Sequence, residues 1–364
     1  MRYISLLIVV LTVIAATEIR AQDEIGSVLT FSLGARGLAL GQAAVATAEG
    51  PSALLTNSAA IGGYSGYGAT IGYGSSLPTT TDESTLQGAV AGTLLPGTLS
   101  LGASYIKSNL DGMGWYLRNS LARIHAAYRP MENLSVGVSL NSYRYEASYV
   151  RRDEGNNVLG TIDDDVTAFD FGLSARYELR SVAFGDDALQ IGLDIENLID
   201  TKVKLEHRIE FPAEVEVRKP QYLRFGAAWS IPLAPNEGGS LNPTLIVGSG
   251  ITAARDYFLY KDTTSYPLYP GVTLALRLWD MVTVSWNREE ETNAFSAIPS
   301  YPMQRLGIMA DLPIGEWLKL SYPVMLSVDY CYWTELGDTS IISSLRRNDD
   351  WNRNVLAVGI SVLR

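Results

Sequence analysis

Residues 133–143, NLSVGVSLNSY, alternate large apolar side chains with small or polar ones. Strict alternation puts the two kinds of side chain on opposite faces of a β-strand, whereas a helix would show apolar residues three and four positions apart. The stretch therefore predicts a strand with one apolar and one polar face. The apolar face carries Leu134, Val136, Val138 and Leu140, and the polar face carries Ser135, Gly137, Ser139 and Asn141.

The same alternation returns in residues 168–179, 189–198, 222–232 and 304–313. These runs exceed the length of about five or six residues that is usual for soluble strands. They match the length of about 9–11 residues that a tilted strand needs to cross a bilayer. Charges fall in mid-strand on the polar face, which predicts that this face lines the lumen of a barrel. The predicted lumen-facing charges are Asp170, Arg176, Asp194, Glu196 and Arg224.

Short and long connections alternate between the predicted strands, as is typical of outer-membrane barrels. Short turns are predicted at 95–98, 128–134, 278–282 and 310–317, and longer polar connections at 76–84, 108–115, 149–165, 287–303 and 333–352. We predict an all-β fold, a transmembrane antiparallel β-barrel of about 14 strands (roughly 12 to 16). The barrel is expected to cover residues 63–364.

The first residues have the pattern of a secretory signal. Arg2 precedes an apolar run at residues 3–16, and Ala21 offers a small residue at a plausible cleavage point. The run is shorter than the roughly 20 residues of a membrane-spanning helix. We predict a signal peptide at residues 1–21. Ile19 stands where a small residue is preferred, which leaves an uncleaved anchor as the alternative.

Composition narrows the class of protein. Charged residues make up only 18% of the chain, below the about 25% of a typical soluble domain. The formal net charge is −11, which argues against a nucleic-acid partner, because phosphates attract a basic surface. A single cysteine, Cys331, excludes an intrachain disulfide.

The sequence offers little for catalysis or metal binding. Only His125 and His207 are available as general bases, and no G-x-S-x-G motif accompanies them. Two histidines and one cysteine cannot form a Cys/His zinc site. The consecutive carboxylates at 163–165 lack the spacing of a calcium loop, and we expect a solvated acidic loop there. Residues 66–74, GYGATIGYG, lack the spacing of a dinucleotide-binding motif and are expected to form the first strand. We expect no enzyme activity, no metal and no cofactor.

Residues 34–61, GARGLALGQAAVATAEGPSALLTNSAAI, carry the most specific motif. A Gly-Ala-Arg triplet is followed by further glycines, an Ala/Val run and a short helical pattern, SALL, that ends near Asn57. The segment resembles the one before the first strand of PorV/PorQ-type and FadL-like outer-membrane barrels. Several positions depart from that pattern. Gln42 replaces a Gly, Ser58 replaces a Pro, Gly50-Pro51 stands where acidic residues are common, and Arg364 is the last residue where such barrels usually have an aromatic one.

The resemblance implies that residues 22–62 form a plug with a small helix inside the lumen. The high content of small residues permits close packing of backbone against backbone. A flexible tether is the alternative, but Leu and Val are frequent for a solvated linker. The residues expected to pack the plug against the lumen are Gly34, Arg36, Gly37, Gly41, Leu54 and Asn57.

The resemblance also implies two possible roles for a monomeric protein of the bacterial outer membrane. PorV-like proteins work with type IX secretion, which implies that secreted cargo proteins or a secretion translocon bind the outward loops. FadL-like proteins instead pass long-chain fatty acids or other hydrophobic small molecules through the lumen. Sequence length and strand motifs favour the secretion role. A conduit for hydrophobic molecules needs a largely apolar pocket with a few polar groups, and the lumen predicted above is polar. Outer-membrane lipid is the other expected partner, and no nucleic acid is expected.

Overall fold

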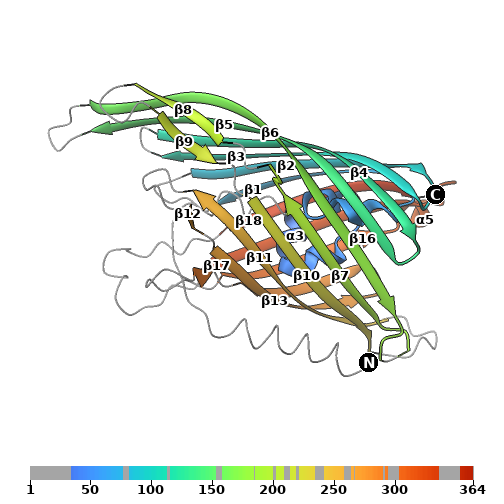
Figure 1. The fold of residues 1–364 in the computed structure, drawn as a ribbon. Coiled ribbons are helices and arrows are strands. Elements are labelled where there is room, and N and C mark those ends of the chain that lie inside the picture. Colours follow the sequence, from blue (N-terminus) through green and yellow to red (C-terminus); the bar gives the residue numbers. More distant parts are fainter. Residues whose placement is uncertain are drawn as a thin grey trace, which may run out of the picture.

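The protein forms a closed antiparallel β-barrel of 14 strands in the computed structural model (Figure 1). The strands of the barrel are β1 (Gly66–Ser76), β2 (Asp82–Leu95), β3 (Leu99–Gly112), β4 (Trp115–Met131), β5 (Leu134–Arg152), β6 (Val158–Arg180), β7 (Ala188–Glu196), β10 (Gln221–Pro232), β11 (Thr244–Tyr257), β13 (Pro267–Leu278), β14 (Val282–Glu289), β16 (Met303–Leu312), β17 (Val324–Glu335) and β18 (Arg353–Leu363). The predicted fold class and strand number are therefore confirmed.

The structure describes residues 34–76, 82–112, 115–152, 158–183, 185–199, 202–208, 214–218, 221–233, 242–257, 264–265, 267–289, 292–293, 303–335 and 353–363. The predicted signal peptide at residues 1–21 lies outside the described residues, as do residues 22–33 of the predicted plug. Among the helices of the described part, none is long and apolar enough to cross a membrane.

Closure of the barrel comes from β1, which pairs with β2 on one side and with β18 on the other. The β1–β18 ladder runs from Gly66 opposite Leu363 to Ser76 opposite Arg353. Closure leaves no unpaired edge, which is the condition for a sheet to cross a bilayer, since lipid offers no partner for backbone groups.

Four shorter strands lie outside this closed ladder. They are β8 (Lys202–Arg208), β9 (Glu214–Arg218), β12 (Thr264–Ser265) and β15 (Thr292–Asn293). β8 and β9 form a hairpin, and β8 also pairs with β6 at Thr161 and Ile162. Figure 1 shows this hairpin against the far ends of β5 and β6, which extend beyond the rest of the barrel.

The two ends of the barrel differ. At one end, which we call the short-turn end, β2 joins β3 through residues 96–98, β4 joins β5 through 132–133, and β13 joins β14 through 279–281. The turn after β16 contains the one-turn helix α5 (Ile314–Trp317). We call the opposite end the long-loop end. The four predicted short turns all lie at the short-turn end.

Two predicted long connections are wrong, because the strands continue through them. β3 and β4 are separated only by residues 113–114, and β5 and β6 by residues 153–157. β5 has 19 residues and β6 has 23, about twice the length needed to cross a bilayer. The polar residues there predict loops, but a strand that extends beyond the membrane needs no apolar face. The acidic residues 163–165 accordingly lie in the backbone of β6 and not in a loop.

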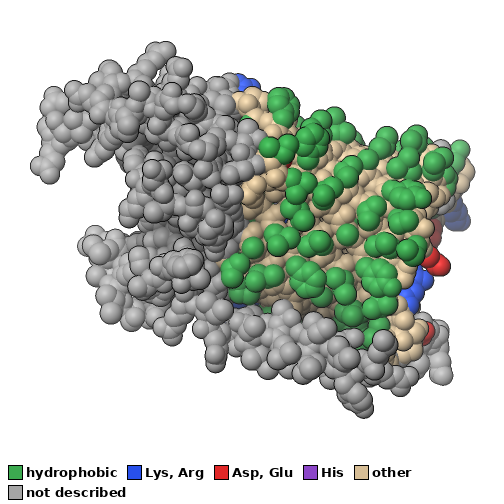
Figure 2. Space-filling view, viewed as in Figure 1, with side chains coloured by type: hydrophobic (Ala, Val, Ile, Leu, Met, Phe, Trp, Pro, Cys, Tyr) green, Lys and Arg blue, Asp and Glu red, His purple; other side chains and the backbone are tan. Residues whose placement is uncertain are grey.

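Burial is the reverse of that in a soluble sheet. Along β5, Ser135, Ser139 and Asn141 are buried, while Val138 and Leu140 are exposed. Exposed apolar side chains recur on the outward face of the neighbouring strands and cover it (Figure 2). The apolar face therefore points out of the barrel and suits contact with lipid, and the polar face points into the lumen.

A chain of short helices lies inside the barrel (Figure 1). We call it the inner segment. It comprises α3 (Gly34–Leu40), η2 (Gly41–Ala43), α4 (Ala44–Thr47), η3 (Pro51–Leu55) and η4 (Ser58–Ile61). Its side chains are almost all buried, and Leu38, Leu54 and Leu55 join wall residues such as Ile106 and Val355 in one apolar core.

The outward face of β4 offers a test of the membrane-facing surface. Ile124 is 66% exposed on that face, four positions before the exposed Tyr128. Ile124→Arg should lower the free energy of unfolding by about 2–4 kcal/mol, because a cation on the lipid face is costly near the bilayer centre. Urea unfolding in phospholipid vesicles, followed by tryptophan fluorescence, measures it. Ile124→Val is the matched control, and an equal cost for both variants would contradict contact of this face with lipid.

Candidate functional site

The candidate site is the lumen, which the inner segment fills by close contact with glycines of the wall. A side chain added at Gly192 would overlap with the carbonyl oxygen of Val45, and one added at Gly226 would overlap with that of Gln42. Leu54, a predicted plug residue, packs in the same way against Gly102. These glycines let the backbone of the inner segment touch the backbone of the strands.

The predicted glycines of the inner segment are all buried in the lumen. Gly34 begins α3 with φ of 69°, and Gly41 begins η2 with φ of 55°, a region that favours glycine. A Cβ on Gly41 would lie 3.0 Å from Cγ of Asn287. Gly37 lies within α3 and is buried.

Arg36 joins α3 to the wall through an ion-paired network. Its Nη2 contacts Asp311 at 2.6 Å and Asp329 at 2.8 Å, and its Nε also donates to Asp329. Burial alone would lower the pKa of the Arg36 guanidinium, but attraction to Asp329 and Asp311 raises the pKa above its ordinary value. Arg36 therefore stays charged and holds α3 against β16 and β17.

A second network holds η2 against β14 and β16. Gln42 donates to Glu289 and accepts from the Thr252 hydroxyl at 2.7 Å. Glu289 in turn pairs with the fully buried Arg305. Asn287 donates to the carbonyl oxygens of Leu38 and Ala39 at 2.9 and 2.8 Å, which satisfies backbone groups of the inner segment.

The predicted charges of β7 and β10 meet in a third network. Arg224 lies 3.1 Å from Asp194 and 2.9 Å from Glu196. Arg123 of β4 also pairs with Glu196 and reaches the carbonyl oxygen of Leu55 at 3.5 Å. All four side chains are buried, so the charges are neutralised by one another within the lumen wall.

The other two predicted lumen charges face inward without joining this network. Asp170 accepts from the backbone N–H groups of Phe171 and Ile199 at 2.6 and 2.8 Å. Arg176 reaches the carbonyl oxygen of Ala48 at 3.5 Å and the carboxylate of Glu49 at 3.6 Å.

Asn57 and its neighbour Ser58 fix the end of the inner segment. Asn57 donates to the carbonyl oxygen of Val45 at 2.6 Å and caps η4 by accepting from the backbone N–H of Ala59. The Ser58 hydroxyl contacts Nδ1 of His125 at 2.7 Å, and Ser104 contacts the other ring nitrogen at 2.8 Å. Because both nitrogens of the buried ring are occupied, His125 connects η4 with β3 and acts as a structural link.

Several of these residues were not selected from the sequence. Alternation already assigned Arg305 to the polar face of its strand, and Arg123 and His125 flank the apolar Ile124 in the same way. Strand alternation could therefore have found them as inward-facing, but nothing in the sequence pairs Arg305 with Glu289 or Arg123 with Glu196. Among the described residues, no group of His, Cys, Asp or Glu could hold a metal ion.

One part of the wall carries no charge. We call the inward faces of β18, β1, β2 and β3 the uncharged sector, and every described side chain there is neutral and mostly small. The hydroxyls of Thr85 and Ser108 and both amide atoms of Gln87 are buried there without a hydrogen-bond partner in the described part of the chain. The sector contains Val355, Ala357, Thr70, Gly72, Thr85, Gln87, Ala89, Ala91, Ser104, Ile106 and Ser108.

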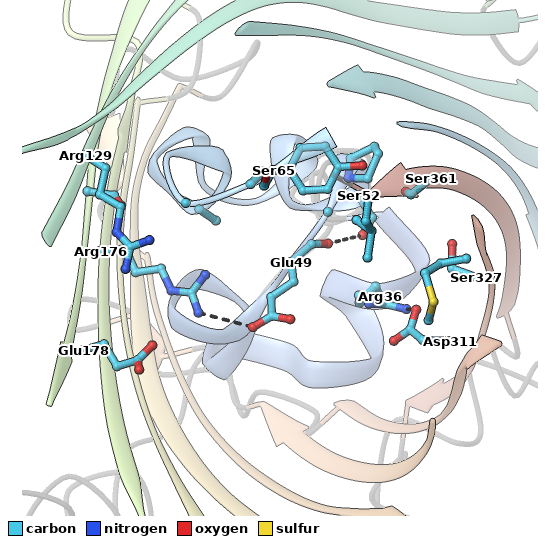
Figure 3. Close-up of a pocket in the computed structure, with 18 of the residues that line it drawn as sticks. Arg36, Glu49, Ser52, Ser65, Arg129, Arg176, Glu178, Asp311, Ser327 and Ser361 are labelled. Atoms are coloured by element: carbon cyan, nitrogen blue, oxygen red, sulfur yellow. Dashed lines mark hydrogen bonds and ion pairs between the residues drawn. The ribbon is translucent and has the colours of Figure 1, made fainter. Parts of the chain in front are cut away.

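A cavity of about 610 Å³ opens beside the inner segment at the short-turn end. Figure 3 shows Arg129, Arg176 and Glu178 on one side of it and Arg36 and Asp311 on the other. Thr70 and Ser361, on the inward faces of β1 and β18, also line the cavity, so the uncharged sector reaches it.

Comparison with solved structures identifies the fold. The chain is similar to the CymD monoaromatic hydrocarbon channel, with a TM-score of 0.55, 11% identity and coverage of 92% of this chain and 98% of that one. It is similar to the Pseudomonas putida toluene transporter TodX, with a TM-score of 0.55, 12% identity and coverage of 91% and 98%. It is also similar to a Pseudomonas aeruginosa FadL homologue, with a TM-score of 0.53, 11% identity and coverage of 90% of this chain and 98% of that one. The fold is that of FadL/TodX-type barrels. Comparison with protein-family models and with curated proteins finds no match.

Glycine contacts with the inner segment can be tested in the wall. Gly192→Ala should lower the free energy of unfolding by about 1–3 kcal/mol, because the added methyl group overlaps with the Val45 carbonyl. Gly88→Ala is the control, since its Cβ would meet no atom closer than 3.4 Å. Urea unfolding in detergent micelles compares the two. Equal stability of the variants would mean that the inner segment does not touch β7 at this point.

The Glu289–Arg305 pair offers a second test. Glu289→Gln should lower the free energy of unfolding by about 3–5 kcal/mol, because a buried guanidinium loses its carboxylate. Adding Arg305→Met should recover part of that loss, since the uncompensated charge is then gone. Arg180→Gln, which removes an exposed pair with Glu178, should cost at most about 1 kcal/mol. If the double variant lost as much stability as Glu289→Gln and Arg305→Met lose together when measured singly, this coupling would be contradicted.

Proposed function

We propose that the protein is an outer-membrane channel for small hydrophobic molecules. Two barrels of the same fold are the CymD monoaromatic hydrocarbon channel and the toluene transporter TodX. Sequence identities of 11 and 12% indicate a shared fold alone. A route for a hydrophobic solute therefore has to be argued from the residues that line this lumen.

The uncharged sector supplies that support. The inner segment is bonded to charged or polar wall residues around most of the lumen, through Arg36, Gln42 and Ser58. A hydrophobic molecule could pass there only by breaking those pairs. Along β18, β1, β2 and β3 the described wall has no charge to desolvate, and many of its inward residues are small. The sector also reaches the cavity at the short-turn end.

Two parts of the inner segment cover this sector, α3 along β18 and η3 along β1, β2 and β3, and η3 makes apolar contacts there. Leu54 packs against Gly102, and Pro51 packs against Gly68. Within the described residues, the one hydrogen bond from η3 to the wall joins the Leu55 carbonyl oxygen to Arg123, at 3.5 Å. Solute that replaces η3 along this wall would exchange one apolar contact for another, at little cost in polar interactions.

Neutral polar groups at the long-loop side of the sector fit the same solute class. Thr85 and Ser108 are opposite each other on β2 and β3, and Gln87 and Ile106 are the next inward pair. The sector combines small apolar side chains with neutral hydroxyl and amide groups, and small-molecule sites also combine an apolar lining with a few polar groups. These groups would orient a solute without requiring it to carry a charge.

The secretion role expected from the PorV/PorQ resemblance has less support. The three structural relatives named above are a hydrocarbon channel, a toluene transporter and a FadL homologue, and none of them is named as a secretion component. The comparisons therefore favour the channel. An outer-membrane location agrees with the barrel fold and with the apolar outward face.

Uptake into proteoliposomes tests the proposal. The protein should raise the entry of radiolabelled toluene above that of empty vesicles. Ser108→Phe should reduce this uptake several-fold, because the ring narrows the uncharged sector on its inward face. Lys107→Phe is the matched control, since alternation puts the same ring on the outward face of β3, and it should leave uptake unchanged.

Two outcomes would contradict the channel. One is a wild-type rate equal to that of empty vesicles for toluene and for longer hydrocarbons. The other is purification from the native host with secreted proteins or a large translocon barrel bound, and with no hydrophobic small molecule in the lipid extract. That second result would favour the secretion role.

A further inference from the structure

Two arginines at the cavity of the short-turn end make few polar contacts with the described residues. Arg129 of β4 and Arg176 of β6 both line it, and Ser135 of β5 lines it between them. Ser135 is directly opposite Arg176 in the β5–β6 ladder. Arg129 follows Tyr128, the partner of Val136 in the β4–β5 ladder, and Ser135 precedes Val136, so the two residues are neighbours across the ladder where its register shift begins. Three adjacent strands thus present guanidinium, hydroxyl and guanidinium in a row.

Among the described residues, neither guanidinium donates a hydrogen bond to a carboxylate. Arg129 donates from Nε and Nη2 to one backbone carbonyl oxygen, that of Glu132 in the adjoining turn. Among the described residues, Arg176 makes two long contacts, 3.5 Å to the Ala48 carbonyl oxygen and 3.6 Å to the Glu49 carboxylate. Within the described part of the chain, the Ser135 hydroxyl makes no hydrogen bond. The row therefore has several N–H donors and one O–H donor facing the cavity.

Two other arginines of the cavity are paired, and a third, Arg277, also lines it. Arg36 is bonded to Asp311 and Asp329, and Arg180 is bonded to Glu178 at 2.6 Å. Glu178 also attracts Arg176 electrostatically, but its carboxylate oxygens accept hydrogen bonds from Arg180 and Gln190. Glu132 and Asp280 also line the cavity, from the turns at its rim.

The Glu49 carboxylate makes a loose contact with Arg176 of this row. Its side chain is 59% exposed, and it precedes Gly50, which has φ of 67° and open space around it. A carboxylate at 3.6 Å from Arg176 is a weak ion pair in a solvated position. It lies where the oxygen of an incoming anion would be expected.

We propose that Arg129, Ser135 and Arg176 form a binding site for a small oxyanion, a carboxylate or a phosphate, and that Glu49 competes with this ligand for Arg176. Planar guanidinium groups bind both kinds of oxyanion through paired N–H donors, and a hydroxyl adds a third donor. The row faces the lumen, so lipid headgroups outside the barrel are not its ligands. The site is independent of the hydrophobic route, because it needs charge where that route needs none.

Anion titration of the full-length protein in detergent micelles tests the site. Sodium phosphate and sodium acetate are the probes, each compared with sodium chloride at equal ionic strength, with binding measured by calorimetry. Phosphate or acetate should bind to the wild type. Arg129→Gln or Arg176→Gln should weaken binding at least about tenfold, since each removes charge-assisted hydrogen bonds. Glu49→Gln should strengthen binding about two- to fivefold by removing the competitor.

Arg180→Gln is the matched control, because it removes the same charge from the same cavity but from a residue paired with Glu178. It should leave the affinity unchanged. Ser135→Ala keeps all charges and should weaken binding less than either arginine variant. Heat-modifiable migration in gels checks that each variant is folded.

Three results would overturn the proposal. They are no binding of either probe beyond the chloride control, equal weakening by Arg180→Gln and Arg176→Gln, which would indicate a general positive field, and weaker binding after Glu49→Gln. Toluene uptake is a separate readout, so failure of the oxyanion site leaves the channel proposal standing, and the reverse also holds.

Discussion

Pairing of β1 with β18 is the interaction on which the rest of the structure depends. It closes the sheet, so that every strand of the barrel has a hydrogen-bonded neighbour on both sides. Closure also creates an inside and an outside. The alternation of each strand then has only one stable orientation in a bilayer, with apolar side chains outward and polar ones inward. A polar lumen follows directly from closure.

That lumen imposes a second requirement, because its charged groups are removed from bulk water by the inner segment. They are neutralised in local networks, such as Arg224 with Asp194 and Glu196, and Arg305 with Glu289. Buried charges that lack partners would cost several kcal/mol each. The networks surround the lumen unevenly and leave β18, β1, β2 and β3 free of described inward charges, which is the side of the lumen that the proposed channel function would use.

Two departures from the PorV/PorQ-type and FadL-like pattern, Gln42 and Ser58, are explained by this lumen. Gln42, where that pattern has Gly, bonds to Glu289 and Thr252, and Ser58, where it has Pro, bonds to His125. Each substitution adds a side chain that reaches a polar group of the wall. The inner segment is thus fitted to its own barrel, which is a reason why the motif could be recognised from the sequence although its contacts could not.

The sequence by itself determined the strands, their two faces and their approximate number, because alternation with a period of two is a local property of neighbouring residues. It also placed Asp170, Asp194 and Arg224 on the polar face. It misjudged the length of β5 and β6, since a strand that leaves the membrane loses its apolar face and resembles a loop. Only the tertiary structure decided that Arg36 meets Asp329 and that Arg129 and Arg176 flank Ser135 at a cavity. Such contacts join residues far apart in the chain, and they depend on barrel closure and on the register between strands, which no local pattern encodes.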